Sequence, residues 1–194
     1  VEGYFHTRSF KRYALRMLLF AVLSEVPFDL MYGGTVFYPV HQNVIWTLLL
    51  GLLGIRLMEA ARAKGKPWLY VLTCAAVVVL GFALGTLGMV DYYGAGVLTV
   101  FAFYFFRERK WWCLLGQLAA LYWLNVVVLG GQMYPVTLFG REIELCEQGL
   151  ALLALVPIWL YRGRQGHHSK AFQYACYAFY PAHMLVLALL TMIQ

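Results

Sequence analysis

Long apolar runs, separated by short polar connections, follow one another along the chain. Seven of them approach or exceed the roughly 17–25 residues that a helix needs to cross a bilayer. They cover residues 13–30, 43–58, 68–90, 92–106, 111–129, 144–161 and 171–193. The fourth is short, and its start is poorly defined because Asp91, Gly94 and Gly96 lie there. The pattern predicts an all-α, polytopic transmembrane bundle of about seven spanning helices, with six as the alternative.

Composition excludes the soluble alternative. Hydrophobic residues make up 62% of the 194 residues and charged residues only 12%, against about 45–50% and 25% in soluble domains. A soluble domain of this length could not hide so much apolar surface from water. No linker or repeat divides the chain, so residues 1–194 are expected to form a single transmembrane helical domain.

The basic residues predict how the chain is oriented. Fourteen of the 15 lie at alternate connections, which are therefore on one side of a seven-helix zigzag. They are Arg8, Lys11, Arg12 and Arg16; Arg56, Arg62, Lys64 and Lys66; Arg107, Arg109 and Lys110; Arg162, Arg164 and Lys170. Basic residues in short loops mark the cytoplasmic side, so the C-terminus is expected outside. Topology also explains the net charge of +6 without a nucleic-acid partner.

Polar side chains inside the spans concentrate in the predicted outer half. The set comprises Ser24, Glu25, Asp29, Asn43, Asp91, Asn125, Glu144, Glu147, Gln148 and His183. An ionisable group in hydrocarbon costs roughly 2.5–3.5 kcal/mol, so it needs a partner, a wet cavity or a function. A cationic inner mouth suits a phosphate-bearing donor, and a carboxylate–imidazole cluster suits general-base chemistry. Topology alone remains the alternative explanation for the basic residues.

The last run, YACYAFYPAHMLV at 174–186, places a proline and a histidine in an apolar segment. Tyr174, Tyr177, Tyr180 and His183 follow one another at three-residue spacing and so share one helical stripe. Pro181 removes a helical hydrogen bond, which a membrane tolerates only where protein or water satisfies the freed carbonyl. A kink beside a cavity at His183 is one interpretation, and a purely structural kink is the other.

The chain resembles the TraX family of bacterial membrane proteins over essentially its whole length. The resemblance rests on FKRYALRMLLFAVLSEVPFDL (10–30), NVIWTLLLGLL (43–53), DYYGAGVLTV (91–100) and KAFQYACYAFYPAHMLVLALL (170–190). TraX is associated with N-acetylation of conjugative pilin and resembles transmembrane acyltransferases that use cytoplasmic acyl-coenzyme A. The resemblance implies a multi-pass protein of the bacterial inner membrane.

The resemblance also implies roles for particular residues. Coenzyme A phosphates would lie at the basic inner mouth, with Arg12, Arg16, Arg162, Arg164 and Lys170 as candidate donor-binding residues. His183, Glu25 and Asp91 are the candidate catalytic residues, although relatives often carry glutamine at the Glu25 position. Asn43, Tyr177, Tyr180 and Glu147 are the candidate acceptor-binding residues. The four cysteines offer no metal-ligand spacing, so no metal is expected.

Family members begin with a helix that carries an Asp-His pair, followed by a helix whose end resembles VEGYFHT. Since this chain starts at VEGYFHT, we expect it to be the C-terminal part of a protein of about nine helices. An upstream histidine is then an alternative catalytic base to His183.

Three functions are consistent with these features. The first is a membrane-embedded acyltransferase that uses acetyl-coenzyme A, or another acyl-coenzyme A, to acylate an amine or hydroxyl. That acceptor would be a peptide N-terminus, a glycan or a small molecule. The second is a transporter or channel with a mid-membrane proton or solute path, and the third is a non-catalytic assembly subunit. Membrane lipid is the expected surrounding, a homodimer is left open, and the sequence does not identify the acyl chain.

Overall fold

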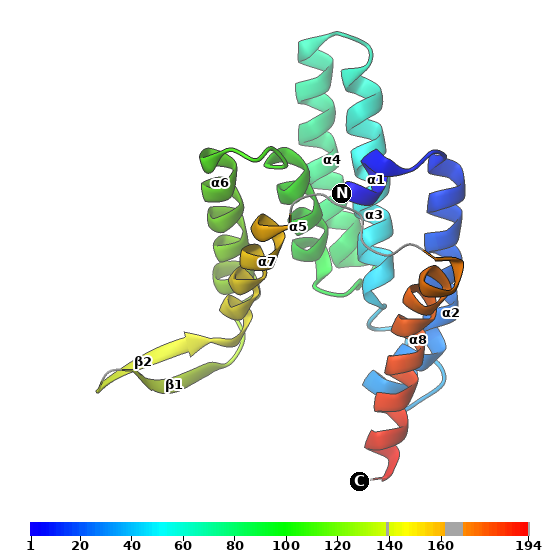
Figure 1. Ribbon diagram of the computed structural model, residues 1–194, viewed down its shortest axis with the longest axis vertical. Helices are drawn as coiled ribbons and strands as arrows, with labels where there is room; N and C mark the ends of the chain where they lie inside the picture. The colour runs from blue at the N-terminus through cyan, green and yellow to red at the C-terminus, as the bar shows by residue number, and fades with distance from the viewer. Residues whose placement is uncertain (139, 162–168, 194) are drawn as a thin grey trace. The chain divides into compact units, whose positions relative to one another are not determined.

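The computed structural model, which describes residues 1–138, 140–161 and 169–193, consists of helices and one β-hairpin (Figure 1). The helices are α1 (Glu2–His6), α2 (Phe10–Gly33), α3 (Val44–Arg62), α4 (Pro67–Leu87), α5 (Tyr93–Phe105), α6 (Trp111–Tyr122), α7 (Leu155–Leu160) and α8 (Lys170–Ile193). A π-helical turn, η1 (Trp123–Leu129), extends α6, and a 3₁₀ segment, η2 (Glu147–Ala154), precedes α7. The strands are β1 (Met133–Leu138) and β2 (Arg141–Cys146).

The chain divides into two compact units. Unit 1 comprises Val1–Val97 with Gln165–Gln194, and unit 2 comprises Leu98–Arg164. The expectation of a single domain over residues 1–194 stays a prediction.

The helix limits follow local signals in the sequence. α2 ends where Gly34 adopts a left-handed conformation (φ 65°), which glycine adopts without steric cost. α3 begins at Asn43, whose side chain accepts a hydrogen bond from the Ile45 amide and so caps the helix. α4 begins with Pro67 in its first turn, where the missing amide hydrogen costs nothing.

The helical membrane architecture predicted from the sequence is confirmed, and the predicted count of about seven spans exceeds the four found among the described residues. Among the described residues, four helical segments are long and apolar enough to cross a membrane. They are Val44–Arg62, Pro67–Leu87, Trp111–Leu129 and Tyr174–Met192, and Tyr93–Phe105 and Glu147–Leu160 are shorter apolar helices. The 24-residue α2 is not among the four, and it carries Arg16, Glu25 and Asp29 within its length.

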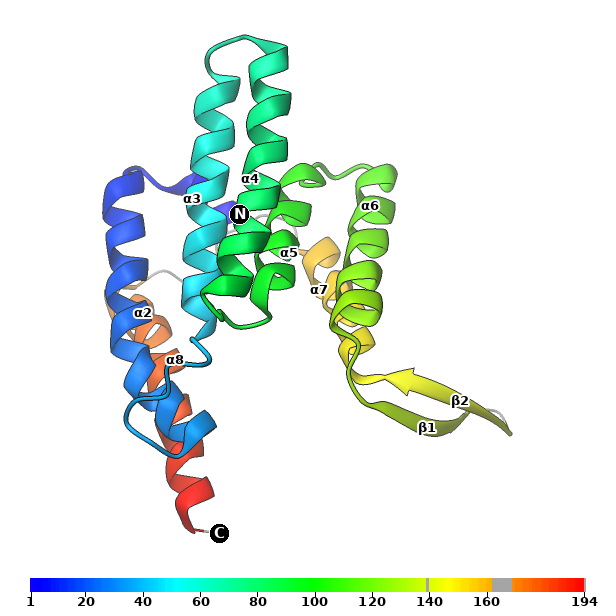
Figure 2. The same ribbon diagram turned by 180° about the vertical axis from the view of Figure 1, so that it is seen from behind.

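In unit 1, α2 packs against both α3 and α8, and α3 packs against α4 (Figures 1 and 2). Both views show α2 and α3 running in opposite directions, and α3 and α4 likewise. Ala21, Ile55 and Met58 are fully buried between these helices. The end of α2, the start of α3 and the end of α4 therefore lie on the same side of unit 1.

Unit 2 contains a feature that hydropathy did not predict. The apolar run 144–161 begins as part of a β-strand, because Arg141–Cys146 pairs antiparallel with Met133–Leu138. Alternating Ile143 and Leu145 with Glu142 and Glu144 has the two-residue period of a strand. Elsewhere in unit 2, the Gln117 amide donates to the Phe106 carbonyl (2.8 Å) and accepts from the Trp159 indole (2.7 Å).

Pro181 does not end α8, which continues from Lys170 to Ile193 with the proline inside it. Pro27 lies inside α2 in the same way. The cavity expected beside His183 stays a prediction.

Candidate functional site

A network of hydrogen bonds joins the middle of α2 to the first turn of α3. The fully buried Asn43 amide donates to the Ala21 carbonyl (2.9 Å) and to Glu25 Oε2. The Trp46 indole donates to the same Glu25 oxygen at 2.9 Å. The sequence placed Glu25 and Asn43 in one polar cluster, and here they are in direct contact. Two donors converge on one carboxylate oxygen, which fixes the orientation of Glu25.

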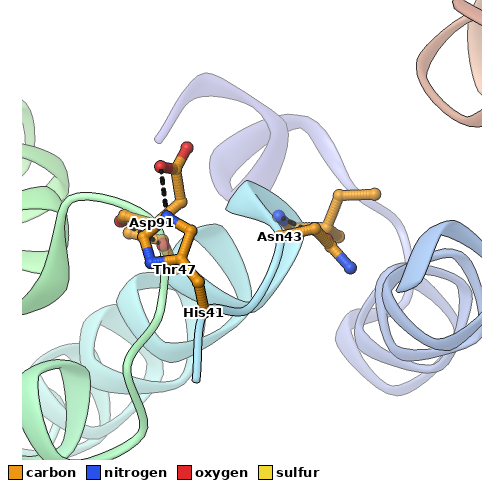
Figure 3. Close-up of polar contacts among 5 residues, drawn as sticks. His41, Asn43, Thr47 and Asp91 are labelled. Atoms are coloured by element: carbon orange, nitrogen blue, oxygen red, sulfur yellow. Dashed lines mark hydrogen bonds and ion pairs between the residues drawn. The ribbon is translucent and has the colours of Figure 1, made fainter. Parts of the chain in front are cut away.

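A second pair lies close by, where the α2–α3 connection meets the α4–α5 loop. His41 Nε2 is 3.4 Å from Asp91 Oδ1, and Thr47 on α3 donates its hydroxyl to the Asp91 carbonyl at 2.8 Å (Figure 3). Only 8% of His41 is exposed. Burial raises the pKa of the Asp91 carboxyl, and the adjacent His41 opposes that shift. The arrangement pairs an imidazole with a carboxylate, as acid–base sites do.

The loop that carries Asp91 is strained. Met89, Tyr92 and Tyr93 have φ values of 50°, 58° and 50°, a left-handed conformation that is uncommon for residues other than glycine. Two hydrogen bonds hold the loop in place. The backbone amide of Gln42 donates to the Met89 carbonyl at 2.8 Å, and the Thr47 hydroxyl donates to the Asp91 carbonyl. Such strain costs of order 1–3 kcal/mol per residue and persists only where surrounding contacts enforce it.

Three buried side-chain oxygens near this network lack a hydrogen-bond partner in the part of the chain that the structure describes. They are Ser24 Oγ, Glu25 Oε1 and Asp29 Oδ1. The other oxygen of Asp29 accepts from the Tyr38 amide at 3.0 Å. An unpaired buried polar group costs about 1–3 kcal/mol, so a donor or a water at these oxygens would be favourable.

α8 reaches the same region through its tyrosines. The Tyr180 phenol faces the backbone amide of Val44 and lies within electrostatic range of Glu25 and Asp91. Tyr177 stacks on Phe20 of α2 at 5.2 Å between ring centroids. Tyr177 and Tyr180 therefore face α2 and α3, the elements that carry the network.

His183 itself contacts its own helix. Its Nδ1 lies 3.0 Å from the Phe179 carbonyl, and its ring stacks on Phe179 at 4.9 Å. It meets the network only indirectly, through the edge of Tyr180 at 5.3 Å. The structure therefore places the predicted catalytic histidine at the margin of the cluster.

Other predicted site residues lie at the start of α2 or of α8, in unit 2, or outside the described residues. Arg12 and Arg16 are exposed on the first half of α2. Glu147 is exposed in unit 2, at the start of η2. Arg162 and Arg164 lie outside the described residues, and Lys170 begins α8. Their roles stay predictions.

The sequence analysis missed His41, Trp46 and Thr47. His41 lies in a connection, outside every apolar run, so it did not count as an embedded polar residue. Thr47 follows the α3 cap, Asn43, by four residues, and this spacing was the available signal. Only the fold shows that Asp91, which is 50 residues after His41 in the sequence, contacts His41.

The comparisons with known proteins agree with this description. The model of a family described as "TraX protein" matches residues 1–191. A protein of Dichelobacter nodosus named "Probable fimbrial assembly protein FimC, serogroup H1" is 26% identical over 96% of this chain and 74% of its own length. No solved structure matches. With its apolar helices and a family match over nearly all of its residues, this multi-pass membrane protein belongs to the TraX family.

Proposed function

We propose that this protein is a membrane-embedded acyltransferase that moves an acyl group, an acetyl in the simplest case, from cytoplasmic acyl-coenzyme A to an amine or hydroxyl. The acceptor would be a peptide N-terminus, a glycan or a small molecule at the bacterial inner membrane or on its outer side. The observation that carries the proposal is the buried and half-buried group of carboxyls, amide and imidazole at one end of helices whose other ends carry cations.

The cationic end suits the donor. Arg12 and Arg16 are four residues apart and exposed on α2, so both can reach an anion on one face of the helix. Guanidinium groups bind phosphate oxygens in a planar, bidentate geometry. Arg16 precedes Glu25 by nine residues, which corresponds to about 14 Å of helical rise. A donor held by its phosphates at this end would have to extend its thioester toward the buried cluster.

The buried end suits the acceptor. Glu25 Oε1 and Asp29 Oδ1 are acceptors without a described partner, so either can take a hydrogen bond from an incoming N–H or O–H group. The acceptor atom attacks the thioester carbonyl carbon, the carbon–sulfur bond breaks, and coenzyme A leaves as a thiolate. A nearby base must remove the acceptor's proton for the attack to proceed at neutral pH.

A second candidate function is a non-catalytic role in pilus assembly, favoured by the name of the Dichelobacter nodosus relative, a probable fimbrial assembly protein. In that case the buried polar groups would serve helix association, since hydrogen bonds between helices stabilise membrane bundles. The two proposals differ in one respect that is simple to measure, which is binding of acyl-coenzyme A.

The test uses purified full-length protein in detergent, incubated with acetyl-coenzyme A and either a peptide with a free N-terminus or a simple alcohol. Acetyl-coenzyme A binding is followed by calorimetry, and transfer by release of free thiol and by the mass of the acceptor. Micromolar binding with acceptor-dependent thiol release supports the acyltransferase. Absence of binding overturns it and favours the assembly role.

A further inference from the structure

We propose that His41 is the proton acceptor of the transfer step and that Asp91 positions it, an inference that rests on the proposed acyltransferase function. Neither the sequence patterns nor the comparisons point to His41. The inference comes from where the fold places its ring, between α2, α5 and the loop that carries Asp91.

The two ring nitrogens of His41 have different surroundings. Nε2 is 3.4 Å from Asp91 Oδ1, so a proton on Nε2 faces a carboxylate and that tautomer is favoured. Nδ1 then carries the lone pair, and among the described residues no hydrogen bond to it is found. The His41 side chain keeps 11% of its surface exposed. The imidazole therefore combines a free basic nitrogen with a carboxylate that stabilises the charge it would gain.

Aromatic rings hold the imidazole in place. Tyr32 stacks on it at 4.7 Å and Phe28 at 5.7 Å, and Tyr93 meets its edge at 5.7 Å. The titratable groups that contact His41 are Asp91 from the loop, Tyr32 from α2 and Tyr93 from α5. A base that is already oriented loses little freedom when the substrate arrives, which is a large part of an enzyme's advantage.

The strained loop indicates that the His41–Asp91 pair has a function other than packing. Three residues around Asp91 keep a left-handed backbone, and Thr47 and Gln42 bond the loop to the segment that contains His41. Backbone strain of this kind clusters at functional sites, where it fixes side chains in a working geometry. Here it places the Asp91 carboxyl against Nε2.

The other candidates fit the role less well. His183 has its Nδ1 on the Phe179 carbonyl of its own helix, and no carboxylate ion pair with it is found among the described residues. Glu25 already receives two donors on Oε2. His41 is the candidate that has both a free nitrogen and a charged partner.

The step balances as a simple proton relay. His41 Nδ1 takes the proton from the acceptor N–H or O–H as the acceptor atom bonds to the thioester carbonyl carbon. The carbon–sulfur bond then breaks, and the departing coenzyme A thiolate takes the proton back from Nδ1. The products are the acylated acceptor and free coenzyme A, with neutral His41 regenerated.

The experiment compares His41→Gln with the full-length wild type in the acetyl-coenzyme A assay. Loss of the base should lower the transfer rate by about 100-fold or more, with acetyl-coenzyme A affinity unchanged. His6→Gln is the matched control, because His6 also faces a carboxylate, Glu2, at 3.5 Å but is fully on the surface, with 74% of its side chain exposed. Its rate should equal that of the wild type.

A second variant separates chemistry from structure. Imidazole added to His41→Ala should raise the transfer rate in proportion to its concentration, whereas a purely structural role would give no such rescue. A wild type that transfers acetyl groups while His41→Gln stays near the wild-type rate overturns the inference and leaves the acyltransferase standing. Failure of imidazole to rescue also overturns it. A wild type without transfer overturns both.

Discussion

The two ends of the helices of unit 1 differ in the exposure of their charged and polar residues, which are exposed at one end and largely buried at the other. At the end where α3 meets α4, Arg62, Lys64 and Lys66 are exposed, as are Arg12 and Arg16 on the first half of α2. At the end where α3 begins, Asn43 and Asp29 are 0% and 2% exposed and make hydrogen bonds across elements. Exposed charges cost little and bind mobile anions, whereas buried polar groups must be paired. The first end suits a transient ligand, and the second suits a preorganised site.

The buried end also depends on contacts far apart in the sequence. Asn43 bonds to Ala21 and Glu25, and His41 faces Asp91. A substitution there should therefore disturb several elements at once, while a substitution at the cationic end should affect ligand binding alone. The following predictions test that contrast, from the largest expected effect to the smallest.

Asn43→Ala should be the most damaging change. It removes the α3 cap and leaves the Ala21 carbonyl and Glu25 Oε2 without the amide donor. We expect a loss of about 3 kcal/mol in the free energy of unfolding, measured by denaturant titration in detergent. Asn125→Ala is the control, because among the described residues the Asn125 side chain donates to the Leu121 carbonyl, one turn earlier in the same helical segment. Its loss should cost about 1 kcal/mol. Equal losses of unfolding free energy in the two variants would contradict the proposal that contacts between elements make the buried end more sensitive to substitution.

Gly94→Ala tests how closely α5 must approach α4. A Cβ atom at Gly94 would come within 2.5 Å of the Phe82 carbonyl oxygen, which is backbone and cannot move aside. Overpacking of this kind costs about 1–3 kcal/mol and should lower the thermal unfolding midpoint. At Gly149 the nearest atom to an added Cβ is 3.5 Å away, so Gly149→Ala should change the midpoint little. A tolerated Gly94→Ala would show that the loop before α5 is not tightly placed.

Arg16→Ala tests the cationic end. If Arg16 binds a donor phosphate, its loss should weaken acetyl-coenzyme A binding about tenfold, or about 1.4 kcal/mol, without changing the unfolding midpoint. Arg141→Ala, in the exposed hairpin of unit 2, removes the same charge and serves as the control. Equal affinity of Arg16→Ala and wild type would remove Arg16 from the donor site.

The pH dependence of stability should reveal the partly buried Asp91 carboxyl. Because its pKa is raised in the folded protein, the native state holds this proton more tightly than the unfolded chain does. The stability it contributes is therefore complete below the ordinary value of 3.8 and is lost as pH rises through the raised pKa. Asp91→Asn should show a smaller fall in unfolding midpoint over that range. Glu142→Gln, an exposed carboxyl in β2, should follow the wild type.

Much of the architecture follows from the sequence, because hydropathy and turn residues act locally. The predicted run 43–58 corresponds to the helix Val44–Arg62, which starts after its cap, Asn43. The predicted run 92–106 corresponds to Tyr93–Phe105, which starts after the Asp91 loop. The predicted span count exceeds the four found among the described residues, in part because length and hydropathy do not weigh charges such as Glu25 within α2. The hairpin at 133–146 was missed because a hydrophobic average does not register a two-residue period.

The residues of the candidate site also fall into those that the sequence could identify and those that it could not. Glu25, Asn43, Asp91 and Tyr180 could be chosen from sequence, because polar groups in apolar helices are costly and therefore conspicuous. His41 could not, since a histidine in a connection is unremarkable until its neighbours are known. Outside the hairpin, the sequence by itself determined most of the helical segments and which polar groups they carry. Only the tertiary structure decided which of those groups meet, because the packing of α2, α3 and the α4–α5 loop, not spacing along the chain, brings His41 to Asp91.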